Sequence, residues 1–347
     1  MIYANLHAAG RSNNSLFAAE DSVHRFNPTY MPRLLRETFL EQGVEINTPD
    51  VNRGREIAFD LYFEGQTFDD DGIPKYLIAM ENPYHNRLNE DRDYYRRFRK
   101  VFTFDKRFYD LPNVVGIMVP HSLEFDSFPS FAERDIFSCL INANKSFRKP
   151  IENDLYVERI KTIRWYERHA PQHFELYGMG WQKPTPAYGF VNKVGRSFSR
   201  MRSKLFGYKP FPSYRGEVKD KSTVLLGSKY SYCYENTLGP DNYITEKIFD
   251  SFVCGCVPIY WGPENALEHI PADCFIDRST FKNTAAVHSH LLTITPVDYA
   301  AYQARIEGYL KSDAAKRFDA KEFALNIAKP ILQDVQSRGT DVRLSGH

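Results

Sequence analysis

The stretch YSYCYENTLGPDNYITEKIFDSFVCGCVPIYWGP occupies residues 230–263 and sets a polar loop, broken by Gly and Pro, between two apolar segments. Thr245 is a plausible N-cap for a helix that runs from Glu246 to about Val253, and Gly255 would end it. The following CVPIYWG then reads as a buried strand. This order of strand, loop, helix and strand is typical of a parallel sheet with helical crossovers.

The same rhythm recurs along the rest of the chain and predicts an α/β fold. Its 347 residues suffice for two domains, each with its own core. A polar segment at about 130–155 is the expected boundary, which predicts domains of residues 1–150 and 151–347. A helix ended by glycine is expected at 28–43, and a second helix at 156–170. Strands are expected at 57–63, 75–81, 100–105, 114–120 and 229–237.

Composition excludes several classes of protein. Lys and Arg number 45 against 44 Asp and Glu, so the chain lacks the positive excess expected of a nucleic-acid binder. The five cysteines are an odd number without metal-site spacing, and they are interpreted as core thiols in a reducing, cytoplasmic compartment. The amino terminus does not resemble a signal peptide, and no apolar run reaches the roughly 18 residues of a membrane span.

The adjacent Glu246 and Lys247 open the expected helix at the carboxyl end of a strand. Parallel α/β sheets bind ligands at that edge. A lysine there can pair with a diphosphate, while a carboxylate can accept hydrogen bonds from sugar hydroxyls, and together these roles describe a nucleotide-sugar site. The alternative from these two residues alone is a solvated first helical turn, with the glutamate favoured by the helix dipole.

The surrounding residues resemble the donor-binding signature of glycosyltransferase family 10, the α-1,3/1,4-fucosyltransferases. That signature has an aromatic-Glu-Asn-Ser/Thr strand end, then Tyr-Val/Ile-Thr-Glu-Lys, an apolar helix, and a turn that begins with Val/Ile-Pro and ends with Gly-Pro. The matching segments are 234–237, 243–247 and 257–263. The resemblance is strong over about 225–285, weaker over 155–182, and only suggestive before that.

This resemblance implies a GT-B fold, in which two Rossmann-like domains face each other across a cleft and the carboxyl-terminal domain holds GDP-fucose. It implies that Lys247 meets the diphosphate and Glu246 the ribose or fucose hydroxyls. Asn236 and Tyr243 would contact the nucleotide and sugar, while Glu235 is a candidate for a structural role. No cofactor or metal is expected beyond the donor, and the acidic run at 69–71 is interpreted as surface.

The family also places an arginine on a helix ahead of a strand that ends in Gly-x-Gly, and this arginine reaches the phosphates. Arg159 fits that position, with Arg164 as a competitor, and Gly178 and Gly180 follow in LYGMGW. An ordinary solvated arginine remains the alternative.

Inversion at the sugar's anomeric carbon needs a base that takes the acceptor's proton. The family's base follows a strand in the amino-terminal domain, and Glu81, before Asn82 and Pro83, fits that place. Its position at an apolar strand end is expected to raise its affinity for protons. An ordinary strand-terminal acid is the alternative.

Residues 192–215 depart from the family and look like an insertion, with seven basic residues and no acidic one. The spacing of apolar and basic residues over 193–206 predicts a helix with an apolar stripe and a basic face. Such a helix can contact an anionic inner membrane, bind a phosphorylated or lipid-linked acceptor, or pack on the domain with its basic face in water.

The expected activity is therefore inverting transfer of L-fucose from GDP-fucose, α-1,3-linked to an N-acetyllactosamine-like or lipid-linked glycan. Two alternatives stay open: transfer from another nucleotide-sugar, and binding of a nucleotide-sugar or glycan without turnover. The sequence does not separate donors, because pocket shape selects base and sugar.

Overall fold

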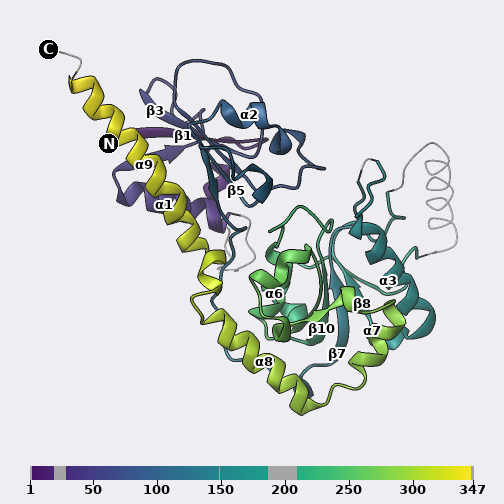
Figure 1. Ribbon diagram of the computed structural model, residues 1–347. Coiled ribbons are helices and arrows are strands. Elements are labelled where there is room, and N and C mark those ends of the chain that lie inside the picture. The colour runs from purple at the N-terminus through teal and green to yellow at the C-terminus, as the bar shows by residue number, and fades with distance from the viewer. Residues whose placement is uncertain (1, 19–28, 148, 187–208, 345–347) are drawn as a thin grey trace. The chain divides into compact units, whose positions relative to one another are not determined.

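The computed structural model describes residues 2–18, 29–147, 149–186 and 209–344. The chain folds into two units, which are coloured from purple to yellow along the chain in Figure 1. The first unit contains residues 1–122, 240–243 and 316–347, and the second contains 123–239 and 244–315. The expected insertion lies mostly outside the described residues, and so does the basic helix expected at 193–206.

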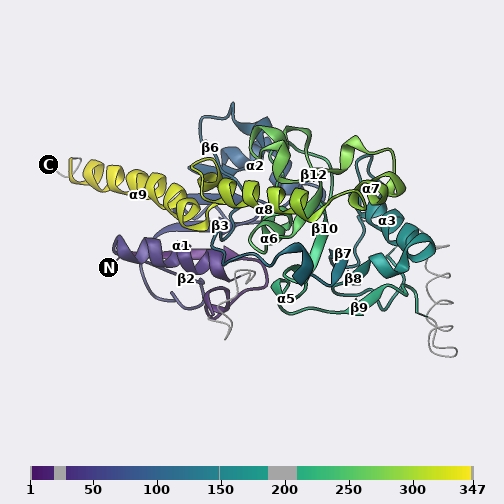
Figure 2. The ribbon, with the colours of Figure 1, turned by 90° about the horizontal axis from the view of Figure 1, so that it is seen from below.

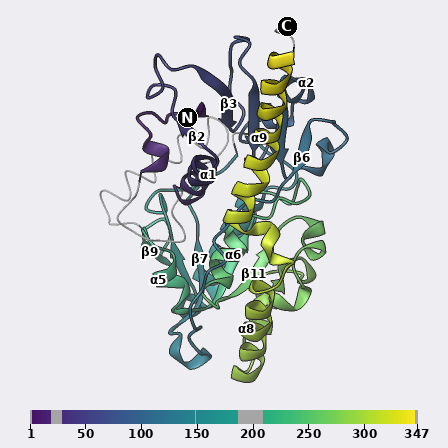
Figure 3. The same cartoon turned by 90° about the vertical axis from the view of Figure 1, so that its left-hand side faces the viewer.

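The first unit is a six-stranded parallel sheet in the order β2-β1-β3-β4-β5-β6. Helices α1 and α9 pack against each other on one face, as Figures 1 and 3 show, and together with the sheet they enclose the largest apolar core of this unit. Short helix α2 contributes Tyr94 and Tyr95 to a smaller, aromatic cluster with Tyr62 and Phe98. The bounds are β1 (Ile2–Ala8), α1 (Tyr30–Glu41), β2 (Val44–Asn47), β3 (Ile57–Phe63), β4 (Lys75–Ala79), α2 (Arg92–Arg96), β5 (Lys100–Thr103), β6 (Val114–Gly116) and α9 (Ala320–Leu344).

The second unit is also a six-stranded parallel sheet, in the order β12-β11-β10-β7-β8-β9. The bounds are β7 (Ile136–Ile141), α3 (Leu155–His169), β8 (Glu175–Tyr177), β9 (Tyr214–Gly216), α5 (Ser222–Leu225), β10 (Ser228–Tyr234), α6 (Glu246–Phe252), β11 (Val257–Trp261), β12 (Ile276–Asp277), α7 (Thr284–Leu291) and α8 (Pro296–Leu310).

Helices cover both faces of this second sheet. Successive residues of a strand point to opposite faces. Accordingly, the Tyr232 hydroxyl lies 2.8 Å from that of Tyr166 on α3, while the Cys233 sulfur lies 3.2 Å from the Ser251 hydroxyl on α6. Figures 1 and 2 show α3 and α7 side by side, and Figure 1 shows α6 on the other side of β10. The alternation of apolar runs and helices therefore yields the expected parallel sheet with helical crossovers.

Most expected elements form close to their expected limits. Gly255 ends α6 with a φ of 59°, and a Cβ there would lie 2.3 Å from the Phe128 ring, so glycine is required for conformation and for space. Thr245 precedes α6, but its side chain does not cap the helix and instead donates to Glu235. All five cysteines are buried and free, as the composition predicted.

The division into units differs from the boundary expected at residue 150. Strand β7 already belongs to the second unit, which begins at Leu123. Helix α9 returns the end of the chain to the first unit, where Phe323, Ile327 and Ile331 join the core beside Leu35 and Phe39 of α1. A single boundary assigns every residue after it to one domain, so it cannot describe a helix that returns to the first unit. The apolar stripe of α9 does not show in the sequence which sheet the helix covers.

Candidate functional site

Glu235, the first residue after β10, is the centre of the site in the second unit. It is fully buried, and its carboxylate accepts hydrogen bonds from the Thr245 backbone N–H at 2.9 Å and the Thr245 hydroxyl at 2.8 Å. The Tyr260 hydroxyl lies 3.3 Å away and the Lys247 Nζ 3.0 Å away. A buried carboxylate requires such partners. Glu235 therefore connects the start of α6 to the ends of β10 and β11.

Lys247 extends along this carboxylate and is itself largely buried, with 14% of its side chain exposed. Its Nζ donates to the Thr245 hydroxyl at 2.7 Å and lies 3.5 Å from Glu246 Oε1. Burial opposes the charged form of Lys247, but Glu235 and Glu246 together raise its pKa. Two carboxylates, those of Glu235 and Glu246, thus keep the lysine in its charged form.

Glu246 is more open, with 46% of its side chain exposed. Burial works against its ionisation, but Lys247 and Lys221 hold its pKa well below its usual range. It is therefore an ionised, accessible hydrogen-bond acceptor. The adjacent opposite charges are explained by this arrangement, since each stabilises the charged form of the other beside the buried Glu235.

Arg159 of α3 approaches the same strand end from the opposite face of the sheet. It is 3% exposed, and its Nη2 donates to the carbonyls of Tyr234 at 2.5 Å and Glu235 at 2.9 Å, and to Asn236 Oδ1 at 3.1 Å. Arg164 instead binds Glu167 at 2.6 Å and the Pro210 carbonyl at 2.8 Å, away from this strand end. Of the two candidate arginines, only Arg159 reaches the residues that carry the motif.

The remaining two donor-site candidates differ in their surroundings. Asn236 is half-buried, and its side-chain oxygen accepts a hydrogen bond from Arg159. Tyr243 is 3% exposed and belongs to the first unit, where its ring packs 5.4 Å from that of Phe104. The structure therefore groups Asn236, Glu246, Lys247 and Arg159 in one unit and places Tyr243 in an aromatic contact of the other.

Glu81 lies in the first unit, two residues after β4, at the carboxyl edge of that sheet. Its Oε1 accepts from the Asn82 N–H at 2.8 Å. The side chain is exposed, so the desolvation expected at an apolar strand end is absent. The location after a strand agrees with the expectation, but its environment is a hydrogen-bonded turn in solvent.

Glu64, which the sequence analysis did not single out, holds the backbone at Glu81. Its carboxylate accepts from the N–H groups of Met80 at 3.1 Å and Glu81 at 3.0 Å, and from Asn89 Nδ2 at 2.6 Å. Burial raises the pKa of Glu64 to about 7, although these hydrogen bonds act to lower it. Its φ of 66° is in the left-handed region, which is uncommon for glutamate. The available signal was its position between the end of β3 and Gly65.

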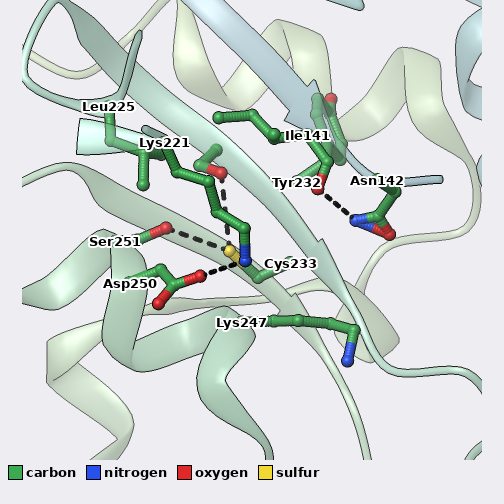
Figure 4. A pocket seen from close by; sticks show the side chains of 10 residues that line it. Ile141, Asn142, Lys221, Leu225, Tyr232, Cys233, Lys247, Asp250 and Ser251 are labelled. Atoms are coloured by element: carbon green, nitrogen blue, oxygen red, sulfur yellow. Dashed lines mark hydrogen bonds and ion pairs between the residues drawn. The ribbon is translucent and has the colours of Figure 1, made fainter. Parts of the chain in front are cut away.

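A second residue that sequence reasoning missed is Lys221, which lies beneath the site. It pairs with Asp250 of α6 at 2.5 Å beside a cavity of about 20 Å³ between α5, α6 and β10. Figure 4 shows this pair next to Cys233 and Ser251, with Lys247 along the same wall. The cavity has room for about one water molecule, so it is not a substrate site. Lys221 acts instead through its charge on Glu246.

Two further properties concern the described residues only. Within them, no group of three or more His, Cys, Asp and Glu side chains is arranged to hold a metal ion. Among the helices of that same part of the chain, none is both long enough and apolar enough to cross a membrane.

Comparison with known proteins finds relatives for part of the chain. Residues 191–312 match the model of glycosyltransferase family 10 (fucosyltransferase) C-term. An alpha-(1,3)-fucosyltransferase of Helicobacter pylori is 38% identical over 66 residues, which are 19% of this chain and 14% of the relative. A mouse 4-galactosyl-N-acetylglucosaminide 3-alpha-L-fucosyltransferase 9 is 36% identical over 78 residues, 21% of each chain. The matches thus span a small part of these relatives' length.

Solved structures show the fold. A sucrose-phosphate synthase from Thermosynechococcus elongatus superposes with a TM-score of 0.59 at 10% identity, over 97% of this chain and 100% of the other. Anabaena HepE in complex with UDP and glucose gives 0.53 at 12% identity, over 95% and 99%. The fold expected from the resemblance is confirmed by these glycosyltransferase neighbours. The protein therefore has a GT-B fold, and its residues 191–312 are similar to the C-terminal domain of glycosyltransferase family 10, the fucosyltransferase family.

Proposed function

We propose that the protein is an inverting fucosyltransferase that moves L-fucose from GDP-fucose to a hydroxyl group of a glycan. The observation that carries this proposal is the placement of two cations at one strand end of a family 10 domain. Lys247 is held by the Glu235 carboxylate, and Arg159 by the Glu235 carbonyl. A single residue therefore positions both positive charges, one from each face of the sheet.

These residues suit the parts of a nucleotide-sugar. Lys247 supplies a point charge and Arg159 a planar fork of N–H donors, and both kinds of group bind phosphate oxygens. Glu246 is ionised and accessible, so it can accept hydrogen bonds from ribose or fucose hydroxyls. The Asn236 amide stands beside Arg159 as a neutral polar contact.

The transfer step needs a proton acceptor and a stabilised leaving group. In the proposed reaction, the acceptor oxygen attacks the anomeric carbon of fucose, and its proton passes to the Glu81 carboxylate. The bond from that carbon to the GDP oxygen breaks, and the electron pair leaves with GDP. Lys247 and Arg159 stabilise the charge on the departing diphosphate, so a divalent cation is not needed for that task. Glu64 and Asn89 fix the backbone from which Glu81 extends.

The proposal also covers the glycan acceptor and the membrane surface at which the protein acts. The names of the relatives support an α-1,3 linkage to an N-acetylglucosamine-containing glycan. The basic, acid-free pattern of residues 193–206 supports contact with an anionic membrane surface on the cytoplasmic side, where a lipid-linked acceptor would be presented.

The test is a donor panel with direct detection of the released nucleotide. The full chain is incubated with GDP-fucose, GDP-mannose, UDP-glucose or UDP-galactose and N-acetyllactosamine, and nucleotide and product are quantified. We expect GDP release from GDP-fucose only, dependent on acceptor, with an α-linked product by NMR. Release of UDP would favour the alternative donor, and binding of GDP-fucose without any release would favour the non-catalytic alternative.

A further inference from the structure

A second cavity in the second unit is separate from the residues described above. It has a volume of about 530 Å³ and lies between α3, the end of β11, and the segment that leads into α7. Neither Lys247, Glu246, Arg159 nor Asn236 lines it. Small-molecule sites commonly enclose roughly 300–1,000 Å³, so the cavity is large enough for a sugar with a charged substituent.

Arg278, in the short helix η8 (Arg278–Thr280), supplies a buried positive charge to this cavity. It is 5% exposed, and its Nε donates to the Tyr234 hydroxyl at 3.1 Å and its Nη1 to the Phe281 carbonyl at 2.7 Å. Both acceptors are neutral. Within the described ranges, no carboxylate lies at ion-pair distance from Arg278.

This lack of a counter-ion is unusual for a buried cation that faces a cavity. In the same unit, Lys247 has Glu235 and Lys221 has Asp250. Among the residues that the structure describes, buried Arg134 also has no carboxylate partner, but it donates to four backbone carbonyls, at Pro129, Leu225, Ser228 and Cys254. Arg278 makes only two hydrogen bonds, of which one goes to a backbone carbonyl, and it borders open space, which leaves its charge to be balanced by a ligand.

The rim of the cavity adds more positive charge. Lys161 and Lys282 line it together with Glu158, which pairs with Lys161 at 2.6 Å. Counting formal charges, three cations face one carboxylate, an excess of two positive charges. The cavity is therefore complementary to an anion.

Aromatic rings provide the rest of the surface. Trp165, Trp261 and Phe281 line the cavity, and the Arg278 guanidinium lies 4.5 Å from the centre of the Trp261 ring. His169 stacks on Trp165 at 5.2 Å and limits the rotation of that ring. Rigid aromatic faces next to hydrogen-bonding groups suit the mixed apolar and polar surface of a pyranose ring.

We propose that this cavity binds an anionic saccharide, a sugar unit that carries a phosphate or a carboxylate group. Arg278 and Lys282 bind the anionic group, and the tryptophans pack against the sugar ring. The site goes beyond the proposed transfer activity and does not depend on it, because it shares no residue with the donor site.

Intrinsic tryptophan fluorescence can report binding in this cavity. Of its three tryptophans, Trp165 and Trp261 line the cavity, whereas Trp181 is 2% exposed and lies elsewhere. Glucose 6-phosphate, glucuronate, glucose and inorganic phosphate are titrated into the full chain, with tryptophan fluorescence and calorimetry as readouts. Saturating GDP keeps the donor site filled, and the titrations are repeated with Lys247→Ala, so that a failure of donor binding is detected separately.

We expect both anionic sugars to quench tryptophan fluorescence and to bind at least about tenfold more tightly than glucose or phosphate, since each contributes only one of the two contacts. A preference for one anionic sugar identifies which charged group is recognised. Equal binding of phosphate alone would overturn the saccharide part of the proposal, and no binding of either anionic sugar would overturn the whole.

Variants assign the binding to this cavity. Lys282 is exposed, so Lys282→Glu should fold normally and weaken glucose 6-phosphate binding about fivefold. Arg278→Gln should weaken it by at least about tenfold. Lys311→Glu makes the same charge change at the residue that follows α8, in the same unit but outside the cavity, and should leave binding unchanged. Equal affinity in Lys282→Glu, Lys311→Glu and the unmodified chain would place the ligand elsewhere and refute the proposal.

Discussion

Lys247 has two roles in this structure, as partner of the buried Glu235 and as the proposed phosphate contact, and one set of variants separates them. Lys247→Met retains most of the apolar stem but removes the charge that lies 3.0 Å from Glu235. The carboxylate keeps its hydrogen bonds from Thr245 and Tyr260 but loses its only cation within ion-pair distance among the described residues. We expect lower stability and weaker GDP binding.

The size of the stability loss follows from the geometry. At 3.0 Å and an effective dielectric constant of about 20, the attraction is about 5.5 kcal/mol before desolvation is counted. Breaking a buried pair by removing one partner costs about 3–5 kcal/mol. Lys247 retains some contact with solvent, and three other hydrogen bonds remain on Glu235, so the loss should lie near the lower limit, at about 3 kcal/mol.

The double variant Lys247→Met/Glu235→Gln distinguishes the two roles. It removes the uncompensated charge, so urea unfolding should recover most of the lost free energy, whereas calorimetry should still show weakened GDP binding. Glu235→Gln alone is the matched control for the loss of the carboxylate. The reasoning is refuted if Lys247→Met unfolds like the unmodified chain, or if the double variant regains full GDP affinity.

Four other predictions concern Glu81, metal independence, Glu64 and the basic segment. Glu81→Gln should retain GDP binding and lose roughly 10² to 10⁴ in transfer rate, and an unchanged rate would remove Glu81 as the base. A chelator should leave the transfer rate of the unmodified enzyme largely intact, and a loss of rate that added metal reverses would contradict this. Because burial raises the pKa of Glu64 from 4.5 to about 7, the folded protein binds this proton more tightly than the unfolded chain. The free energy of unfolding should therefore fall by at most about 3 kcal/mol as the pH rises from 4.5 through 7, and Glu64→Gln should flatten this part of a urea-unfolding pH series; an unchanged profile would contradict the assignment. The full chain should sediment with anionic vesicles at low salt and not with neutral ones, and Arg196→Glu/Arg200→Glu/Lys204→Glu should abolish this; recovery of the unmodified chain in the supernatant would end the membrane proposal.

The sequence by itself determined the elements and the place of the site. Apolar runs with short polar breaks predicted the parallel strands, and the segment 230–263 predicted the strand, helix and strand around Glu246 and Lys247. These features depend on local periodicity and on turn residues such as Gly255, whose conformational needs are visible within a few positions of the chain.

Only the tertiary structure decided how these residues are paired. Arg159 meets Glu235 across a separation of 76 residues, and Arg278 meets Tyr234 across 44. Glu64 reaches Glu81 because β3 and β4 are neighbours in the sheet, and α9 completes the core of the first unit from the far end of the chain. Hydrogen bonds and burial act through space, and the order of residues along the chain does not contain the strand order that brings such partners together.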